Sequence, residues 1–171
     1  IIDDSSEMGG VQFSSFYFFQ ELQQYPHIET QLLLPRHGQF SKLCEKNLIP
    51  FLIYNSPTML SSSVSFFHDL IRIPNPIAWI YNIINIYNNS KRIRNLLKEH
   101  RNTVILSKGL YSHFVTTIAN RKLSNKLIWH LQDLISSRFG GILLKLMNYF
   151  AKLGPNYIVC DGKSIFKSLN S

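Results

Sequence analysis

Cysteine is scarce in this chain: Cys44 and Cys160 are the only two among 171 residues, and they lie far apart. Because no Cys-x-x-Cys pair occurs, neither a disulfide framework nor a structural metal site is expected, and a reducing compartment is the default. No apolar run approaches the roughly 20 residues that span a bilayer, and no pattern typical of a cleavable signal occurs. These absences predict a soluble, cytoplasmic protein without a metal cofactor.

Several catalytic motifs are absent as well. The lack of Gly-x-Ser-x-Gly disfavours a Ser-His-Asp hydrolase, and the lack of Gly-x-x-x-x-Gly-Lys-Ser/Thr disfavours a P-loop nucleotidase. The N-terminal glycines do not complete Gly-x-Gly-x-x-Gly, so an ordinary NAD-binding half is poorly supported. Most of the histidines are scattered without the spacing of metal ligands. Among those, His113, early in a predicted helix, is the one candidate for facing a ligand cleft.

Acidic residues are few relative to basic ones. The chain has 10 Asp+Glu against 18 Lys+Arg, a net charge of +8, which favours anionic partners such as phosphates, nucleotides, nucleic acid or lipid head groups. The basic residues do not interleave with aromatic ones as a stacking platform requires, so nucleic acid is not expected. The basic cluster between Lys91 and Arg101 is either the solvated face of a helix or a patch for a membrane or an acidic partner.

What the chain does have is a repeated alternation of short strand-like runs and longer helical segments. The predicted strands lie at 28–34, 48–54, 103–107, 127–131 and 157–160, after a first strand at the N-terminus. The predicted helices lie at 11–24, 40–47, 78–100, 139–153 and 164–169, with one more that follows Lys108-Gly109 and carries Leu110, Phe114, Val115 and Ile118 on one stripe. The helix over 78–100 is expected to break near residues 88–90, and 61–76 is the least regular part. This order predicts an α/β fold, a Rossmann-like three-layer sandwich with a mostly parallel sheet, in a single domain over residues 1–171.

In such a sheet, ligands bind beyond the carboxyl ends of the strands, at the switch in strand order. Residues predicted there include Lys108 and Gly109, and His130 with Asp133. An imidazole can hydrogen-bond a sugar hydroxyl or move a proton near neutral pH, and a nearby carboxylate can orient it. The other interpretation is a packed histidine and an aspartate that caps the next helix. Both stay open from the residues alone.

Gly9 and Gly10 lie between the first strand and the first helix. Free N–H groups at a helix start, uncrowded by side chains, can hold a phosphate. A Gly-Gly pair is also a common turn. The position after a first strand favours the anion site.

Taken together, these residues resemble the N-terminal domain of a GT-B glycosyltransferase of the group 1, or family 4, type. Gly9-Gly10-Val11-Gln12 is similar to the family's glycine-rich loop, residues 35–43 to its Pro-x-x-Gly stretch, and Ser107-Lys108-Gly109 to its small-residue turn. The segment from Leu127 to Leu169 is similar to its strand, His/Asp loop, helix, strand and final helix.

The resemblance implies transfer of a sugar from a nucleotide-sugar donor, with retention of configuration, to a glycan or lipid-linked acceptor. His130 and Asp133 would be the catalytic residues, and Gly9, Gly10, Gln12, Lys108 and Gly109 would bind the donor phosphates or the acceptor. No cofactor or metal is implied. A C-terminal donor-binding domain is expected and is absent from this sequence, so the isolated domain is expected to be inactive. A peripheral contact with the inner face of a membrane is compatible with this role.

The chain also departs from the family pattern. Cys160-Asp161-Gly162 stands where many members have a serine, which weakens a ligand role for Asp161. Leu131 and Gln132 separate His130 from Asp133, so the division of roles between the two is unsettled. The alternative function is a non-catalytic basic α/β module that binds an anionic ligand: nucleic acid, a nucleotide or a membrane surface.

Overall fold

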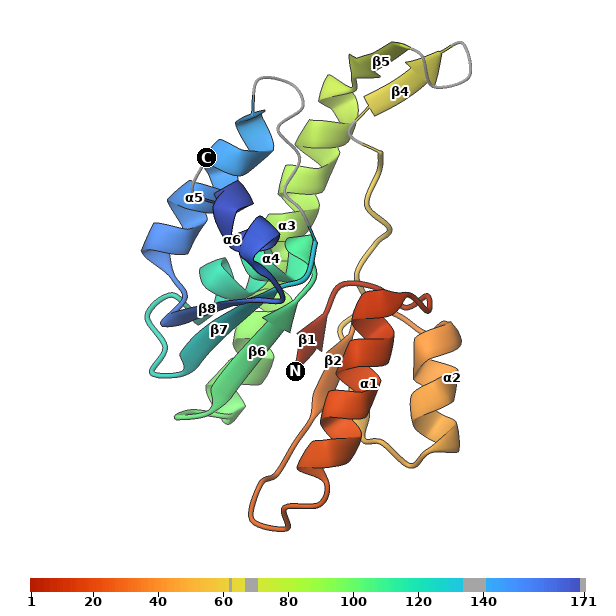
Figure 1. The fold of residues 1–171 in the computed structure, drawn as a ribbon, viewed down its shortest axis with the longest axis vertical. Helices are drawn as coiled ribbons and strands as arrows, with labels where there is room; N and C mark the ends of the chain where they lie inside the picture. The colour runs from red at the N-terminus through yellow and green to blue at the C-terminus, as the bar shows by residue number, and fades with distance from the viewer. Residues whose placement is uncertain (62, 67–70, 134–140, 170–171) are drawn as a thin grey trace.

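The computed structural model describes residues 1–61, 63–66, 71–133 and 141–169. It contains a six-stranded sheet in the order β3-β2-β1-β6-β7-β8 and a separate two-stranded sheet, β4-β5. Figure 1 shows the elements in space. The strands are β1 (Ile2–Asp3), β2 (Leu32–Leu34), β3 (Phe51–Ile53), β4 (Ser63–Phe66), β5 (Ile71–Pro74), β6 (Val104–Lys108), β7 (Lys126–Leu131) and β8 (Tyr157–Cys160). The helices are α1 (Gly10–Leu22), α2 (Gln39–Lys46), α3 (Pro76–Glu99), α4 (Leu110–Asn120), α5 (Ile142–Leu153) and α6 (Lys163–Leu169).

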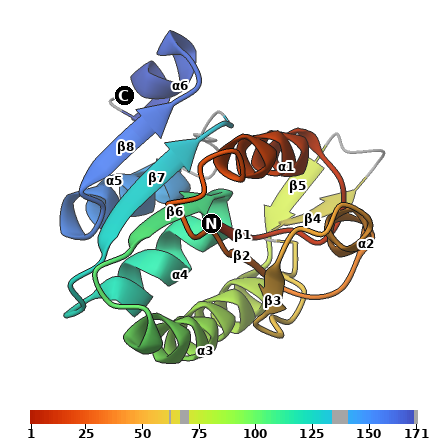
Figure 2. The ribbon, with the colours of Figure 1, turned by 90° about the horizontal axis from the view of Figure 1, so that it is seen from below.

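All neighbours in the large sheet pair in parallel. From β1 the chain moves outward through β2 to β3, and then returns to place β6 on the other side of β1. Because parallel crossovers are right-handed, this reversal puts α1 and α2 on one face of the sheet and α3 and α4 on the other, as Figure 2 shows. The strand order therefore switches between β1 and β6. The predicted Rossmann-like, three-layer α/β fold is confirmed.

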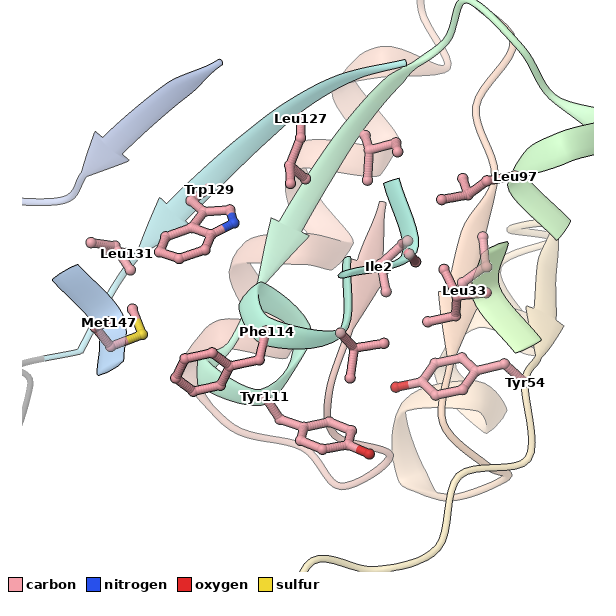
Figure 3. Close-up of a cluster of buried hydrophobic side chains, with 14 of the residues drawn as sticks. Ile2, Leu33, Tyr54, Leu97, Tyr111, Phe114, Leu127, Trp129, Leu131 and Met147 are labelled. Atoms are coloured by element: carbon pink, nitrogen blue, oxygen red, sulfur yellow. The ribbon is translucent and has the colours of Figure 1, made fainter. Parts of the chain in front are cut away.

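The sheet separates two hydrophobic cores, because successive side chains of a strand point to opposite faces. Leu32 and Leu34 of β2 pack with Phe19 of α1 and Phe40 of α2, whereas Leu33 belongs to the core on the α4 face. Figure 3 shows that second core, in which Trp129 of β7 lies close to Leu127 and Leu131. Trp129 is fully buried. Cys44 is buried, Cys160 is partly exposed, and both are free thiols.

Two predictions about the middle of the chain need correction. The expected break near residues 88–90 is wrong, because α3 is continuous over 24 residues. Polar residues suit this part of the helix because Asn89 is buried and its Nδ2 donates to Ser56 Oγ at 2.8 Å. The segment expected to be irregular contains the antiparallel β4–β5 pair. None of the helices in the described ranges combines the length and apolar character needed to cross a bilayer.

The predicted boundaries hold closely for some elements and not for others. The last strand, 157–160, is as predicted, whereas the strand expected over 28–34 pairs only over Leu32–Leu34. The predicted helix over 139–153 begins within the described residues as α5 at Ile142, and residues 139 and 140 lie outside them. Part of the loop that follows His130 and Asp133, residues 134–140, also lies outside the described residues.

Candidate functional site

Three charged or titratable side chains share one face of the sheet at the switch in strand order. Asp3 of β1 pairs in register with Lys108 of β6, and Lys108 pairs with His130 of β7. In a parallel sheet, residues in register point to the same face. This row lies on the α1 face, because Leu127, Trp129 and Leu131 occupy the opposite one.

Helix α1 supplies the polar partners of the row. Gln12 Nε2 and Ser15 Oγ donate to the two carboxylate oxygens of Asp3, at 2.7 and 2.9 Å. Lys108 Nζ donates to Ser14 Oγ at 2.9 Å. Burial raises the pKa of Asp3, against the hydrogen bonds it accepts, and burial lowers the pKa of Lys108, against the nearby Asp3 and Asp161 charges. Two fully buried titratable side chains, Asp3 and Lys108, thus anchor α1 to the centre of the sheet through hydrogen bonds.

A second group of contacts reaches the edge strand. His130 Nε2 donates to Asp161 Oδ1, and Gln132 Nε2 donates to Asp161 Oδ2 at 2.9 Å and to Ser14 Oγ at 3.2 Å. Burial alone would raise the pKa of Asp161, but the hydrogen bonds from His130 and Gln132, together with the charges of His130 and Lys108, lower that pKa. Gln132 Oε1 is buried and has no hydrogen-bond partner among the described residues. His130, Gln132, Ser14 and Lys108 therefore form one continuous polar network with Asp161.

Asp4 and Gly109 meet at the start of α4. Gly109 has a φ of +88°, and a Cβ there would lie 2.1 Å from Asp4 Oδ1. The backbone N–H of Tyr111 donates to Asp4 Oδ2 at 3.0 Å, so the carboxylate caps the helix. Burial, and then the charge of Asp3, raise the pKa of Asp4 to about 7. Only a glycine at position 109 allows this contact.

The glycine pair lies where the sequence predicts it. Gly9 is the N-cap residue of α1, in an extended conformation and without a side-chain cap, and Gly10 is the first residue of the helix. A Cβ on Gly9 would lie 3.0 Å from Gln12 Oε1, whereas one on Gly10 would meet no described atom within 4 Å. Helix α1, which supplies Ser14 to the polar network, thus begins after a residue that has no side chain to cap the first N–H groups.

The sequence-predicted residues fall into three groups. Lys108 and His130 come together in the network, whereas Gln12 binds Asp3, the register neighbour of Lys108, and Gly109 contacts Asp4. Gly9 and Gly10 lie at the start of α1. Asp133 is exposed in a bend after β7, and the partner of His130 is Asp161.

Sequence reasoning missed Asp3 as a member of the site and gave little weight to Asp161. Each lies at or just after the carboxyl end of a strand, β1 and β8. That position was a usable signal, but only the parallel pairing of β7 with β8 brings Asp161 next to His130.

His113 does not face this site. Its ring stacks on Trp129 with 4.9 Å between centroids, and its Nδ1 lies 2.9 Å from Ser107 Oγ. Burial lowers the pKa of His113 to about 3, so the ring is neutral. The expectation that it could face the ligand cleft is wrong, because Ser107 and Trp129 point to the α4 face of the sheet.

No group of three or more potential metal ligands occurs among the described residues. The arrangement instead offers hydrogen-bond donors and acceptors around a histidine at the end of a strand.

No protein-family model matches the sequence, and no curated protein matches it by sequence. The fold is similar to that of Anabaena Alr3699/HepE in complex with UDP and glucose, with a TM-score of 0.70 and 14% identity over 99% of this chain and 40% of that one. The same protein in complex with UDP-glucose gives a TM-score of 0.69 at 15% identity, over 99% and 39% of the two chains. The fold is also similar to that of MurG of Acinetobacter baumannii, with a TM-score of 0.54 and 15% identity over 95% of this chain and 41% of that one. These neighbours are GT-B glycosyltransferases, and the chain spans about 40% of their length. At this level of identity the likeness establishes the fold, that of one GT-B domain, as the sequence predicts.

Proposed function

We propose that this chain is the N-terminal, acceptor-side half of a retaining glycosyltransferase that transfers a sugar from a nucleotide-sugar donor. The observation that carries the proposal is the His130–Asp161 pair at the strand-end face of a fold similar, over 99% of the chain, to a protein that binds UDP-glucose. The acceptor would be a growing glycan or a lipid-linked sugar, in the synthesis of polysaccharide, glycolipid or cell-envelope glycan. A cytoplasmic location remains a prediction.

In this proposal His130 contacts the transferring sugar. Its Nε2 is held by Asp161 Oδ1, which leaves Nδ1 to face the substrate. Asp161 is thus a positioning residue, because it acts through the imidazole ring. Gln132 holds the second carboxylate oxygen and keeps Asp161 in place. Asp133 would line the acceptor side, since it is exposed just after the same strand.

The donor diphosphate would lie against the N-terminus of α1. Negative charge develops on the departing phosphate as the glycosidic bond breaks, and uncrowded N–H groups at a helix start can offset that charge. Gly9 and Gly10 let the phosphate approach the backbone closely. Lys108 and Gly109 would form the floor of the cleft, with the Lys108 ammonium adding positive potential from below. No metal is required by this arrangement. A second, donor-binding domain would complete the site.

The test is turnover of UDP- and GDP-sugars by the full-length protein carrying His130→Ala. We expect turnover to fall by at least about 100-fold, the scale of a lost polar or proton-transfer contact. The urea midpoint should stay unchanged, because His130 is outside both hydrophobic cores. His27→Ala, at an exposed histidine in the loop after α1, is the matched control and should keep wild-type turnover. Full activity of His130→Ala would refute the assignment.

The alternative function, a non-catalytic basic module that binds anionic ligands, is favoured by the net charge of +8. It predicts nucleotide binding with a steep dependence on salt and no turnover of any nucleotide sugar. Turnover that depends on His130 would exclude it.

A further inference from the structure

The outward face of α3 is apolar where a solvated helix should be polar. Ile77, Ile80, Ile84, Tyr87 and Lys91 follow one another at spacings of three and four residues, so they form a single stripe; we call it the α3 outer stripe. Ile77 is 76% exposed and Ile80 61% exposed. Large apolar residues gathered on one exposed face mark an interaction site more often than isolated ones do.

The buried face of the same helix is already occupied. Ala78, Asn85 and Ile93 face the body of the domain. The segment that leads to β4 is fastened along α3, since Leu60 N donates to Asn82 Oδ1 at 3.0 Å and Asn82 Nδ2 donates to Leu60 O at 2.9 Å. These contacts leave the α3 outer stripe uncovered by the described residues. Figure 1 shows this part of α3 extending past the large sheet, beside β4 and β5.

Basic groups surround the far end of the stripe. Lys91 Nζ lies 4.3 Å from the centre of the Tyr87 ring. A surface cavity of about 340 Å³ opens next to it and is lined by Tyr87, Arg94, Ile118, Arg121 and Lys122. Arg94 Nε donates to Ala119 O at 3.0 Å, which fixes the guanidinium between α3 and α4. The lining contains three cations and no carboxylate, and α3 itself carries no aspartate or glutamate before Glu99.

We infer that the α3 outer stripe, with this cavity, docks the protein on an anionic lipid surface. The isoleucines would enter the boundary between acyl chains and head groups, and the cavity would receive a lipid phosphate. An apolar face flanked by lysine and arginine is the pattern of helices that lie in a membrane interface. A second copy of the chain fits less well, because two stripes face to face would bring the same cations together. The inference does not rest on sugar transfer.

The test is flotation of the full-length protein with vesicles of phosphatidylcholine alone, or mixed with phosphatidylglycerol. We expect stronger binding to the anionic vesicles, weakened by salt. Ile80→Ser with Ile84→Ser should lower the partition coefficient about tenfold or more, since two apolar side chains no longer enter the interface. Lys91→Gln with Lys122→Gln should lower it about tenfold on anionic vesicles, with little effect on neutral ones.

The matched control is Ile142→Ser with Leu146→Ser on α5, where both side chains are 46% exposed. It should leave binding within about twofold of wild type if the stripe is the docking site. The urea midpoints of all three variants should match wild type, since the substituted side chains are exposed. Absence of wild-type binding to anionic vesicles would overturn the inference. So would equal losses in the α3 and α5 variants, or a stripe variant that changes only a dimer into a monomer.

Discussion

The two faces of the large sheet differ in what the same strands place on them. In β7, Leu127, Trp129 and Leu131 enter the core under α4, whereas His130, between them, points to α1 and reaches Asp161. In β1, Ile2 belongs to the core, and the next residue, Asp3, accepts a hydrogen bond from Gln12 of α1 on the other face. A period of two therefore lets one short strand place core side chains on one face of the sheet and polar, hydrogen-bonded side chains on the other. A substitution at one position should affect either stability or turnover and spare the other.

The largest expected effect is on the core face. Trp129→Ala removes a fully buried indole that stacks on His113. Loss of so large a core side chain should lower the free energy of unfolding by about 3–5 kcal/mol. Urea denaturation followed by circular dichroism measures it. A loss below about 1 kcal/mol would mean that the α4 face does not carry the stability of the sheet.

A smaller loss of stability is expected for Gly109→Ala, at the start of α4. The new Cβ would lie 2.1 Å from Asp4 Oδ1, and the backbone has a φ of +88°. We expect the free energy of unfolding to fall by about 2 kcal/mol or more. Gly141→Ala is the matched control, because its φ is +70° but no described atom lies within 4 Å of the new Cβ. Equal losses in the two variants would show that crowding by Asp4 contributes nothing.

The third prediction concerns the pH dependence of Asp4, which caps the start of α4. Burial raises the pKa of Asp4 to about 7 in the folded protein, from its ordinary value of 3.8. Between these values the folded state binds a proton that the unfolded state has lost, so the carboxyl costs stability as the pH rises from about 4 to about 7. Asp4→Asn should therefore become more stable relative to wild type over that range.

The difference between Asp4→Asn and wild type is the informative quantity. His113, whose pKa burial lowers to about 3, makes both proteins less stable as the pH falls below its unfolded pKa, so its effect cancels in the difference. Free energies of unfolding from urea titrations at several pH values measure it. A difference that stays constant from pH 5 to pH 7.5 would contradict the raised pKa of Asp4.

Much of the fold could be predicted from the sequence, because strand and helix periods alternate along the chain. The last strand, 157–160, and the helices after Gly10 and Gly109 follow from local pattern and turn residues. The continuity of α3 through Asn89 could not be predicted from local pattern. The buried asparagine is accommodated because Ser56 and Tyr111, both distant in sequence, accept hydrogen bonds from its side chain.

The candidate site could be predicted in part, for a related reason. The strand-end position of His130 and Lys108 is local information. The partner of His130 is not, because Asp161 lies 31 residues away and reaches it only through the pairing of β7 with β8. Proximity in sequence favoured Asp133 instead. The exposure of the isoleucines on the outer face of α3 could not be predicted either. A helical pattern of apolar residues does not show which side of the helix the rest of the domain covers.

The most direct test of this account compares two neighbours on β7 in the full-length protein, Trp129→Phe and His130→Ala. For each, the free energy of unfolding and the kcat/KM with a nucleotide sugar are measured together. We expect Trp129→Phe to lower the free energy of unfolding by about 1–2 kcal/mol and to keep turnover within a few-fold of wild type. His130→Ala should keep stability and lose turnover by about 100-fold or more. Loss of turnover in Trp129→Phe equal to that in His130→Ala, or wild-type turnover in His130→Ala, would contradict the separation of the two faces.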